Sequence, residues 1–285
     1  MRAVVLDSTG QPALAELPEP GEPGTLVRVR ACGLCGSDVE KIGAAPPGTV
    51  LGHEVVAELD DGRRVALVHH APCGECARCL AGHESTCPRF REPTIVPGGF
   101  AEQARARAWV DVPDGLDDAQ ATFAEPLACV LRGAERLPRG RVLVVGCGFV
   151  GTLFAHVLLR RGDDVAGIDP RAERLMLSGL RPPEGPVDAA VLCAPAGADE
   201  AAEYLEPGGT LLAFAAAGAL DLDTVYRNEL VVAGSRSATP AHMHEALALL
   251  PHLELPPVDV LPLERFEEGL ERYRRGDALK VVFTP

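Results

Sequence analysis

The chain has 285 residues, of which 47% are hydrophobic, and a formal net charge of -14 at pH 7. This length allows two domains with a sizeable core in each. The acidic balance argues against binding to nucleic acid or to an anionic membrane surface, because both need clustered Lys and Arg. No apolar run is long enough to cross a membrane, and the first residues lack the apolar segment of a signal peptide, so we expect a cytoplasmic protein.

The first 125 residues are predicted to be rich in short strands. Apolar or alternating runs occur at residues 4–6 and 26–30. Residues 55–59 and 64–68 flank the sequence Asp60-Asp61-Gly62, which favours a hairpin turn. Pro and Gly clusters divide the remainder into loops. This part of the chain therefore indicates a β-rich domain.

From about residue 126 the pattern changes to strands that alternate with helices. A helix is predicted over 150–160, and buried strands are predicted at 141–145, 164–168, 187–193, 210–215 and 229–233. Continuous apolar strands separated by helices indicate a parallel, doubly wound sheet. An amphipathic helix at 266–273 and a last strand at 280–283 follow. We therefore expect one domain over 126–236 and a second built from 1–125 and 237–285.

Four of the nine cysteines have the spacing C-x2-C-x2-C-x7-C. An odd cysteine count in a cytosolic setting speaks against a disulfide framework. Thiolates two residues apart on a tight turn can point at one centre, and four of them complete a closed tetrahedral zinc site. Such a site is structural, because it has no open position. An iron–sulfur cluster is the rival interpretation. The four residues are Cys73, Cys76, Cys79 and Cys87.

A second group of candidate ligands combines different residue types. Cys35 follows an apolar strand in Gly33-Leu34-Cys35-Gly36-Ser37-Asp38, and His53 and Glu54 stand together in Gly52-His53-Glu54. Glu125 comes later, in Ala124-Glu125-Pro126. A thiolate, an imidazole and carboxylates make a mixed zinc shell that leaves room for water or substrate. Each residue alone is a weak signal, and their order around the four cysteines carries the prediction.

A glycine-rich loop follows the strand at 141–145. The sequence G-x-G-x-x-G opens a predicted helix, as the fingerprint of a dinucleotide-binding Rossmann domain requires. In that fingerprint the glycines form a tight turn, let the backbone approach a pyrophosphate and allow close helix packing. Asp169 ends the next strand, where it can bind ribose hydroxyls and repel a 2′-phosphate, so NAD is favoured over NADP. Arg171 could soften that preference. The loop residues are Gly146, Gly148, Phe149, Val150 and Gly151.

In combination these motifs resemble the zinc-containing medium-chain alcohol and polyol dehydrogenases, nearest to the sorbitol and threonine dehydrogenase branch. The resemblance covers essentially the whole chain and includes G-x-C-G-S-D, G-H-E, the four cysteines, G-G-F-A-E at 98–102, E-P-L-A and the glycine-rich loop, in family order. It implies a GroES-like catalytic domain beside the Rossmann domain. Only residues 178–186 separate the second helix from the third strand, so one β–α unit of the family's Rossmann domain is expected to be missing.

The resemblance also implies roles for individual residues. Cys35 and His53 would bind the catalytic zinc, with Glu54 as an exchangeable ligand and Glu125 as a third ligand or a partner through water. Asp38 would hold the ring of His53, although an aspartate that only caps a turn or helix is the alternative. Ser37 matches the family position next to the substrate oxygen, where a proton relay would start. Three residues on, Glu40 stands where the family usually has a histidine, and we hypothesise that Glu40 or a water molecule replaces it in the relay. An exposed Glu40 without a role is equally compatible with the sequence.

The expected activity is hydride transfer between an alcohol or polyol hydroxyl and NAD, with two zinc ions per chain and a small-molecule alcohol or ketone as substrate. Two alternatives stay open: an NADH-dependent ketoreductase of a biosynthetic intermediate, and a non-catalytic zinc-stabilised scaffold of the same fold. Relatives form dimers or tetramers, so a homodimer or homotetramer is expected. His69 and His70 precede the four cysteines and either reach the substrate pocket or serve as structural residues.

Overall fold

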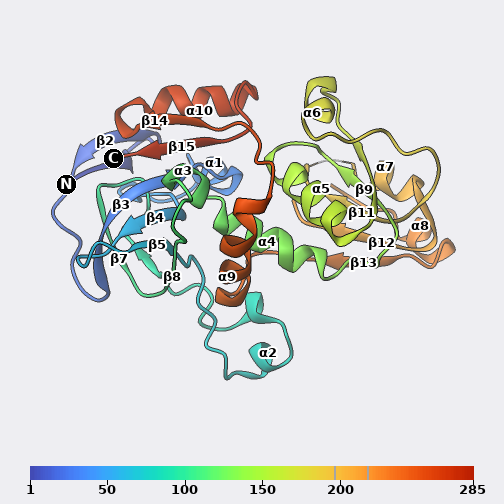
Figure 1. Cartoon of the computed structure of the whole chain (residues 1–285), viewed down its shortest axis with the longest axis horizontal. Helices are drawn as coiled ribbons and strands as arrows, with labels where there is room; N and C mark the ends of the chain where they lie inside the picture. Colours follow the sequence, from blue (N-terminus) through green and yellow to red (C-terminus); the bar gives the residue numbers. More distant parts are fainter. Residues whose placement is uncertain (196, 217) are drawn as a thin grey trace. The chain divides into compact units, whose positions relative to one another are not determined.

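The computed structural model describes residues 1–195, 197–216 and 218–285, and the chain divides into two compact units (Figure 1). Unit 1 comprises Met1–Ala128 and Ala238–Pro285, and unit 2 comprises Cys129–Ser237. Among the described residues, no helix has the length and apolar character needed to cross a membrane.

Unit 1 is built on an eight-stranded sheet in which β3 and β4 are central. Its main path runs β14-β15-β3-β4-β5-β8, while β7 pairs with β3 and with β6. All pairs are antiparallel except β14 with β15. The strands are β3 (Thr25–Gly33), β4 (Glu54–Glu58), β5 (Arg64–Leu67), β6 (Ile95–Val96), β7 (Gln103–Ala106), β8 (Trp109–Asp111), β14 (Asp259–Pro262) and β15 (Val281–Thr284). A separate antiparallel pair consists of β1 (Arg2–Leu6) and β2 (Pro12–Glu16).

Aromatic side chains fill the core between this sheet and α10 (Phe266–Arg275). The ring of Phe266 lies 4.6 Å from that of Phe283 on β15 and 4.9 Å from that of Phe100, measured between centroids. Gly269 lets the helix approach closely, because a Cβ there would stand 2.6 Å from the Phe283 ring. The predicted C-terminal helix and strand are thus both present, and the helix continues two residues beyond the predicted end at Tyr273.

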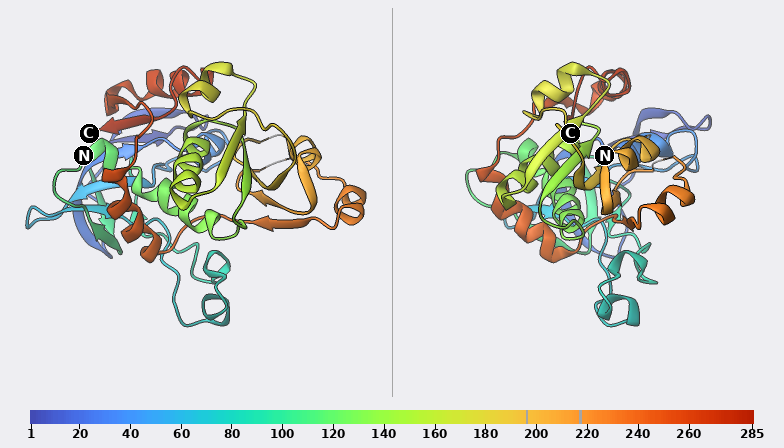
Figure 2. Two further views of the ribbon diagram at one scale, coloured as in Figure 1. Left: turned by 45° about the vertical axis from the view of Figure 1, so that its right-hand side comes forward. Right: turned by 90° about the vertical axis from the view of Figure 1, so that its right-hand side faces the viewer.

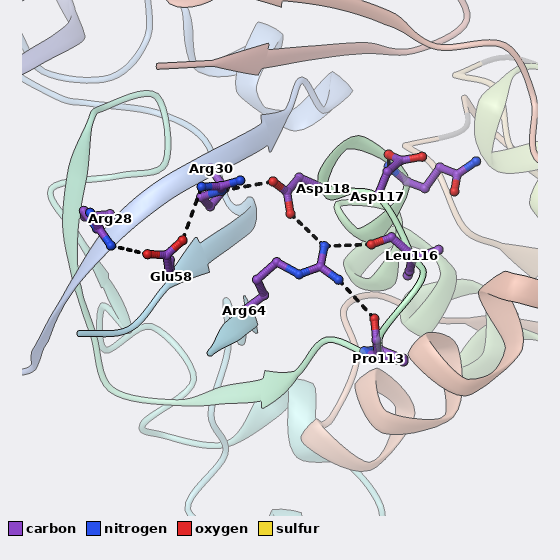
Figure 3. Close-up of polar contacts among 9 residues, drawn as sticks. Arg28, Arg30, Glu58, Arg64, Pro113, Leu116, Asp117 and Asp118 are labelled. Carbon is purple, nitrogen blue, oxygen red and sulfur yellow. Dashed lines mark hydrogen bonds and ion pairs between the residues drawn. The ribbon is translucent and has the colours of Figure 1, made fainter. Parts of the chain in front are cut away.

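The short helix α3 (Asp118–Ala121) is fastened to the central strands by charged side chains (Figure 3). The carboxylate of Asp118 bridges the guanidinium groups of Arg30 on β3 and Arg64 on β5, each at 3.0 Å. Asp117 caps the helix by accepting the backbone N–H of Gln120 at 2.8 Å. These bonds place the start of the following helix, α4 (Ala124–Ala134), which passes from unit 1 into unit 2.

The remaining helices of unit 1 are short. The segment that carries the four cysteines contains α2 and η1, and in both views of Figure 2 it projects away from the strands of its own unit.

No helix was predicted from the sequence where α9 lies, although Thr239 caps it and Pro240 occupies its first turn, which are ordinary helix-start signals. The elements are α1 (Gly36–Lys41), α2 (Ala77–Leu80), η1 (Glu84–Thr86), α9 (Pro240–Leu249), η2 (Leu250–His252) and η3 (Leu263–Arg265).

Unit 2 contains the expected doubly wound parallel sheet, with five strands in the order β10-β9-β11-β12-β13. Helix α5 packs on β9 and β10, and α7 packs on β11 and β12. The last strand begins two residues later than predicted, because Glu229 has a φ of 50° and cannot continue an extended strand. The elements are β9 (Arg141–Val145), α5 (Phe149–Arg161), β10 (Asp164–Ile168), α6 (Ala172–Leu177), β11 (Val187–Leu192), α7 (Ala198–Glu203), β12 (Leu205–Ala213), α8 (Leu222–Arg227) and β13 (Val231–Gly234).

Candidate metal and cofactor sites

Three neighbouring strands of unit 1 meet where their ends carry polar side chains. In the register of the sheet, Gly33 at the end of β3 lies opposite Glu54 at the start of β4 and opposite Val282 of β15. Cys35 follows β3 and caps the N-terminus of α1. Lys280 immediately precedes β15. The sheet register therefore brings together residues that are far apart in the sequence.

Cys35, His53 and Glu54 form a compact donor group. One ligand atom from each lies within 4.8 Å of the other two. His53 and Glu54 are buried, with relative exposures of 6% and 1%, and Cys35 is partly exposed. A thiolate, an imidazole and a carboxylate at these separations fit a zinc ion with a position left open. Among the described residues, Glu125, in the first turn of α4, is not one of the three whose ligand atoms lie this close together, so its role as a third ligand or as a partner through water stays a prediction.

Asp38 holds the donor group in place through hydrogen bonds to His53 and to the neighbouring backbone. Its Oδ1 accepts the ring Nδ1–H of His53 at 3.1 Å and the backbone N–H of Gly52 at 3.2 Å, and its Oδ2 accepts that of Cys35 at 3.2 Å. Burial opposes ionisation of this carboxyl, but the charge and hydrogen bond of His53 lower the pKa of Asp38 below its usual value. This arrangement leaves Nε2 of His53 as the nitrogen available to a metal.

Lys280 is a member of the site that the sequence analysis did not identify. Its Nζ forms a buried ion pair with Oε2 of Glu54 and donates to the backbone oxygen of Leu34 at 3.1 Å. Burial disfavours the charged ammonium, but the charges of Glu54 and Cys35 outweigh it and raise the pKa of Lys280. The available signal was a charged residue at the start of a buried apolar strand, which needs a partner.

The two residues assigned to a proton relay differ in position. The hydroxyl of Ser37 donates to Sγ of Cys35 at 3.5 Å, so Ser37 lies at the donor group. Glu40 is exposed on α1, and within the described ranges it makes no hydrogen bond to Ser37.

His69 lies beside the donor group rather than at a distance from it. The centroid of its ring is 4.5 Å from that of His53 and 3.9 Å from that of His70. Burial, together with the neighbouring His53 and His70, holds the pKa of His69 far below its ordinary value. The ring is therefore neutral at pH 7, with one nitrogen that donates and one that accepts.

The four cysteines of the projecting segment converge on one point. Sγ of Cys73 lies 3.6 Å from that of Cys87 and 3.9 Å from that of Cys79, and Sγ of Cys76 lies 3.5 Å from that of Cys79. Thiolates bound at about 2.3 Å to one tetrahedral zinc stand about 3.8 Å apart. The spacing fits a single ion and is too narrow for a cluster whose cysteines bind different irons.

The glycine-rich loop of unit 2 has the geometry of a phosphate cradle. Gly146 has a φ of 92°, and a Cβ there would stand 2.8 Å from that of Ala194. A Cβ at Gly151 would collide with the backbone oxygen of Gly146. At Gly148 a Cβ would have no neighbour nearer than 4.0 Å, so this backbone is open to a ligand. Phe149 begins α5 there, and the N-terminus of this helix provides free N–H groups for an anion.

Two charged residues of unit 2 face the same loop. Asp169 accepts the backbone N–H of Cys147 through Oδ2 and that of Arg171 through Oδ1, both at 2.8 Å. Arg174, which the sequence analysis did not single out, places its Nη1 near Gly148. Its buried Nε finds no hydrogen-bond partner in the part of the chain that the structure describes. A carboxylate and a guanidinium beside an open loop fit the ribose and phosphate groups of a dinucleotide.

Several known proteins share sequence and fold with this chain. Residues 21–114 match the alcohol dehydrogenase GroES-like domain. The chain is 30% identical over 247 residues to "probable alcohol dehydrogenase AdhA" of Mycobacterium tuberculosis, a match that covers 68% of each protein. It is 35% identical over 189 residues to D-altritol 5-dehydrogenase of Agrobacterium fabrum, covering 57% of this chain and 56% of that protein. The alcohol dehydrogenase TADH of Thermus sp. ATN1 has the same fold, with a TM-score of 0.84 and 26% identity over all of both chains.

A GroES-like unit with a mixed donor group and a Rossmann unit with a glycine-rich loop define a medium-chain oxidoreductase fold. The chain belongs to the zinc-type medium-chain alcohol and polyol dehydrogenases. It spans about half the length of the first relatives that it matches.

Proposed function

We propose that this chain is a zinc-dependent dehydrogenase that moves hydride between the carbon of an alcohol or polyol hydroxyl and NAD, with a ketone or aldehyde as the product. The observation that carries the proposal is the donor group of Cys35, His53 and Glu54, whose ligand atoms lie within 4.8 Å of one another. The relative named for D-altritol supports a polyol as one substrate.

The donor sets suit two zinc ions per chain, one in the open mixed group and one in the closed group of four cysteines. When bound, the zinc of the mixed group would acidify a substrate hydroxyl, and NAD would accept hydride. Asp38 would keep the ring of His53 in the orientation that metal binding requires. Glu54, held by Lys280, would supply the exchangeable carboxylate, and Glu125 would be a third ligand or would reach the zinc through water.

Ser37 is proposed as the first acceptor of the substrate proton, because its hydroxyl touches Sγ of Cys35. From there the proton would pass to solvent near Glu40, which is exposed on the same helix.

For the cofactor we propose NAD in preference to NADP. The carboxylate of Asp169 braces the glycine-rich loop and would repel a 2′-phosphate at the adjoining ribose. Arg171, whose backbone N–H this carboxylate accepts, and Arg174, whose Nη1 lies near Gly148, would moderate the preference.

A paired measurement of metal content and activity tests the proposal. We expect the intact protein to hold two zinc ions by elemental analysis and to reduce NAD with members of an alcohol and polyol panel. The Cys35→Ser variant is expected to keep one zinc and to lose at least about 100-fold in kcat/KM, since removal of a group essential to catalysis typically costs that much. Cys129→Ser, a cysteine outside both donor groups, is the matched control. Full zinc content and full activity in Cys35→Ser would contradict the proposal.

A further inference from the structure

A column of aromatic rings connects the four-cysteine segment with the mixed donor group. Phe90 packs against the buried Cys79 and Cys87, and the ring of His70 stacks on it with centroids 3.8 Å apart. His70 contacts His69, and His69 contacts His53. The column therefore ends with His69 beside a residue of the donor group.

The backbone of His69 is fixed as well as its ring. The hydroxyl of Thr94, which is buried, donates to the backbone oxygen of His69 at 2.5 Å. The ring contacts and this hydrogen bond together leave the imidazole little freedom. A side chain held on two sides is suited to precise placement of a small ligand.

The ring nitrogens of His69 make no hydrogen bond to any residue within 1–195, 197–216 or 218–285. The imidazole is largely enclosed, yet it offers one donor and one acceptor next to the group where a substrate hydroxyl would bind. A purely hydrocarbon substituent packed there would leave these polar atoms without partners, which is unfavourable. A second hydroxyl would satisfy one of them.

We propose that His69 is a specificity-determining residue that hydrogen-bonds the hydroxyl adjacent to the reacting one, so that the preferred substrate is a vicinal diol within a polyol. This inference rests on the proposed function, because it assumes that the reacting hydroxyl is held at Cys35, His53 and Glu54. It adds the requirement for a second hydroxyl on the neighbouring carbon.

The test uses the zinc-loaded full chain and two substrates with the same carbon skeleton, 2,3-butanediol and 2-butanol. His69→Phe retains a ring for stacking and removes both nitrogens, whereas His69→Asn retains hydrogen-bonding groups. His252→Phe, at an exposed histidine of η2, is the matched control. Zinc content and thermal unfolding are measured for every variant, so that loss of metal or of fold is detected separately.

We expect His69→Phe to lower kcat/KM for 2,3-butanediol by about 10- to 100-fold, because a site that hydrogen-bonds a hydroxyl loses most of its discrimination when the partner is removed. The loss should fall mainly on KM, and kcat/KM for 2-butanol should change less than about threefold. His69→Asn should recover part of the diol preference, and the control should resemble the parent. Equal losses for both substrates, or an unchanged preference for the diol, would overturn the inference.

A binding measurement separates this inference from the proposed function. With Co²⁺ in place of zinc, the visible absorption of the mixed donor group reports ligands without any turnover. We expect 2,3-butanediol to shift the spectrum at lower concentration than 2-butanol, and His69→Phe to abolish that difference. Absence of turnover with every alcohol would refute the proposed function, while a His69-dependent diol preference in the spectrum would still support this inference. Equal binding of the two alcohols by the parent protein would refute the inference alone.

Discussion

Lys280 and Glu54 form an ion pair that is almost fully removed from water, with side-chain exposures of 3% and 1%. Burial of two charges is costly, and their attraction offsets the cost only while both are present. The same carboxylate belongs to the mixed donor group, so Lys280 holds a prospective metal ligand in place. Stability and metal binding therefore depend on one pair of side chains.

Lys280→Met removes the positive charge and keeps a side chain of similar length. For the zinc-free protein we expect the free energy of unfolding in urea to fall by about 3–5 kcal/mol, the range found when one partner of a buried ion pair is removed. Because the pKa of Lys280 is raised in the folded state, its contribution is complete at pH 7 and declines only when the pH rises above the ordinary value of 10.5. The loss in free energy of unfolding caused by Lys280→Met should therefore be the same at every pH between 7 and 9.

The double variant Lys280→Met/Glu54→Gln serves as the control for this prediction. With both charges removed, the interior no longer contains an uncompensated ion, and we expect much of the lost stability to return. If the two single losses simply add in the double variant, the side chains do not stabilise each other and the interpretation is wrong.

Asp169 gives a prediction about cofactor choice. Asp169→Asn retains an acceptor for the backbone of Cys147 and removes the negative charge. The ratio of dissociation constants for NADH and NADPH, measured by fluorescence titration, should move toward NADPH by at least about tenfold, or roughly 1.4 kcal/mol. Glu173→Gln, on an exposed position of the nearby helix α6, should leave the ratio unchanged. An unaltered ratio in Asp169→Asn would argue against charge repulsion as the basis of selection.

Residue spacing explains which parts of the site were predictable. Cys35, His53 and Glu54 stand close to strand ends in short, recognisable motifs, and the four cysteines lie within 15 residues of one another. Lys280 is separated from Glu54 by 226 residues. Their contact follows from the register of β15 beside β3, and no local pattern encodes that register.

At the scale of elements, α3 is held by a charge network rather than by apolar packing alone. Asp118→Ala would leave both Arg30 and Arg64 without the carboxylate that bridges them. We expect the free energy of unfolding in urea to fall by about 1–3 kcal/mol, because these guanidinium groups are only partly solvated. In contrast, Asp61→Ala, which breaks an exposed pair with Arg63, should lower the free energy of unfolding much less, because solvent screens that pair. Equal losses at the two positions would show that α3 does not depend on the bridge.

The elements themselves were predicted unevenly. The hairpin of β4 and β5, the five strands of unit 2 and α10 have strong apolar periodicity or clear turn residues, and all are present. An observed strand boundary differs from the predicted one where the backbone leaves the extended conformation, as it does at Glu229 with its positive φ. Helix α9 was missed because its apolar residues are spread around the helix, so no single face marks it in the sequence.

At the scale of the whole molecule, the alternation of strands and helices was enough to predict a doubly wound sheet reduced to five strands. The antiparallel sheet of unit 1 was harder to predict from the sequence. Its strands are short, and β15 from the end of the sequence lies next to β3 from the beginning. Long-range pairing of this kind depends on the packing of the complete core, which local propensity does not report.

The position of β15 also has a consequence for how the protein is made. Glu54 is synthesised early, whereas Lys280 leaves the ribosome 226 residues later. At roughly 5–20 residues per second, the partly formed sheet waits on the order of ten seconds or more for the strand that supplies the counter-charge. During that interval the nascent chain cannot bury the carboxylate in its final setting. The sheet of unit 1 can therefore be completed only after β15 has been synthesised, so the order of synthesis decides when it forms.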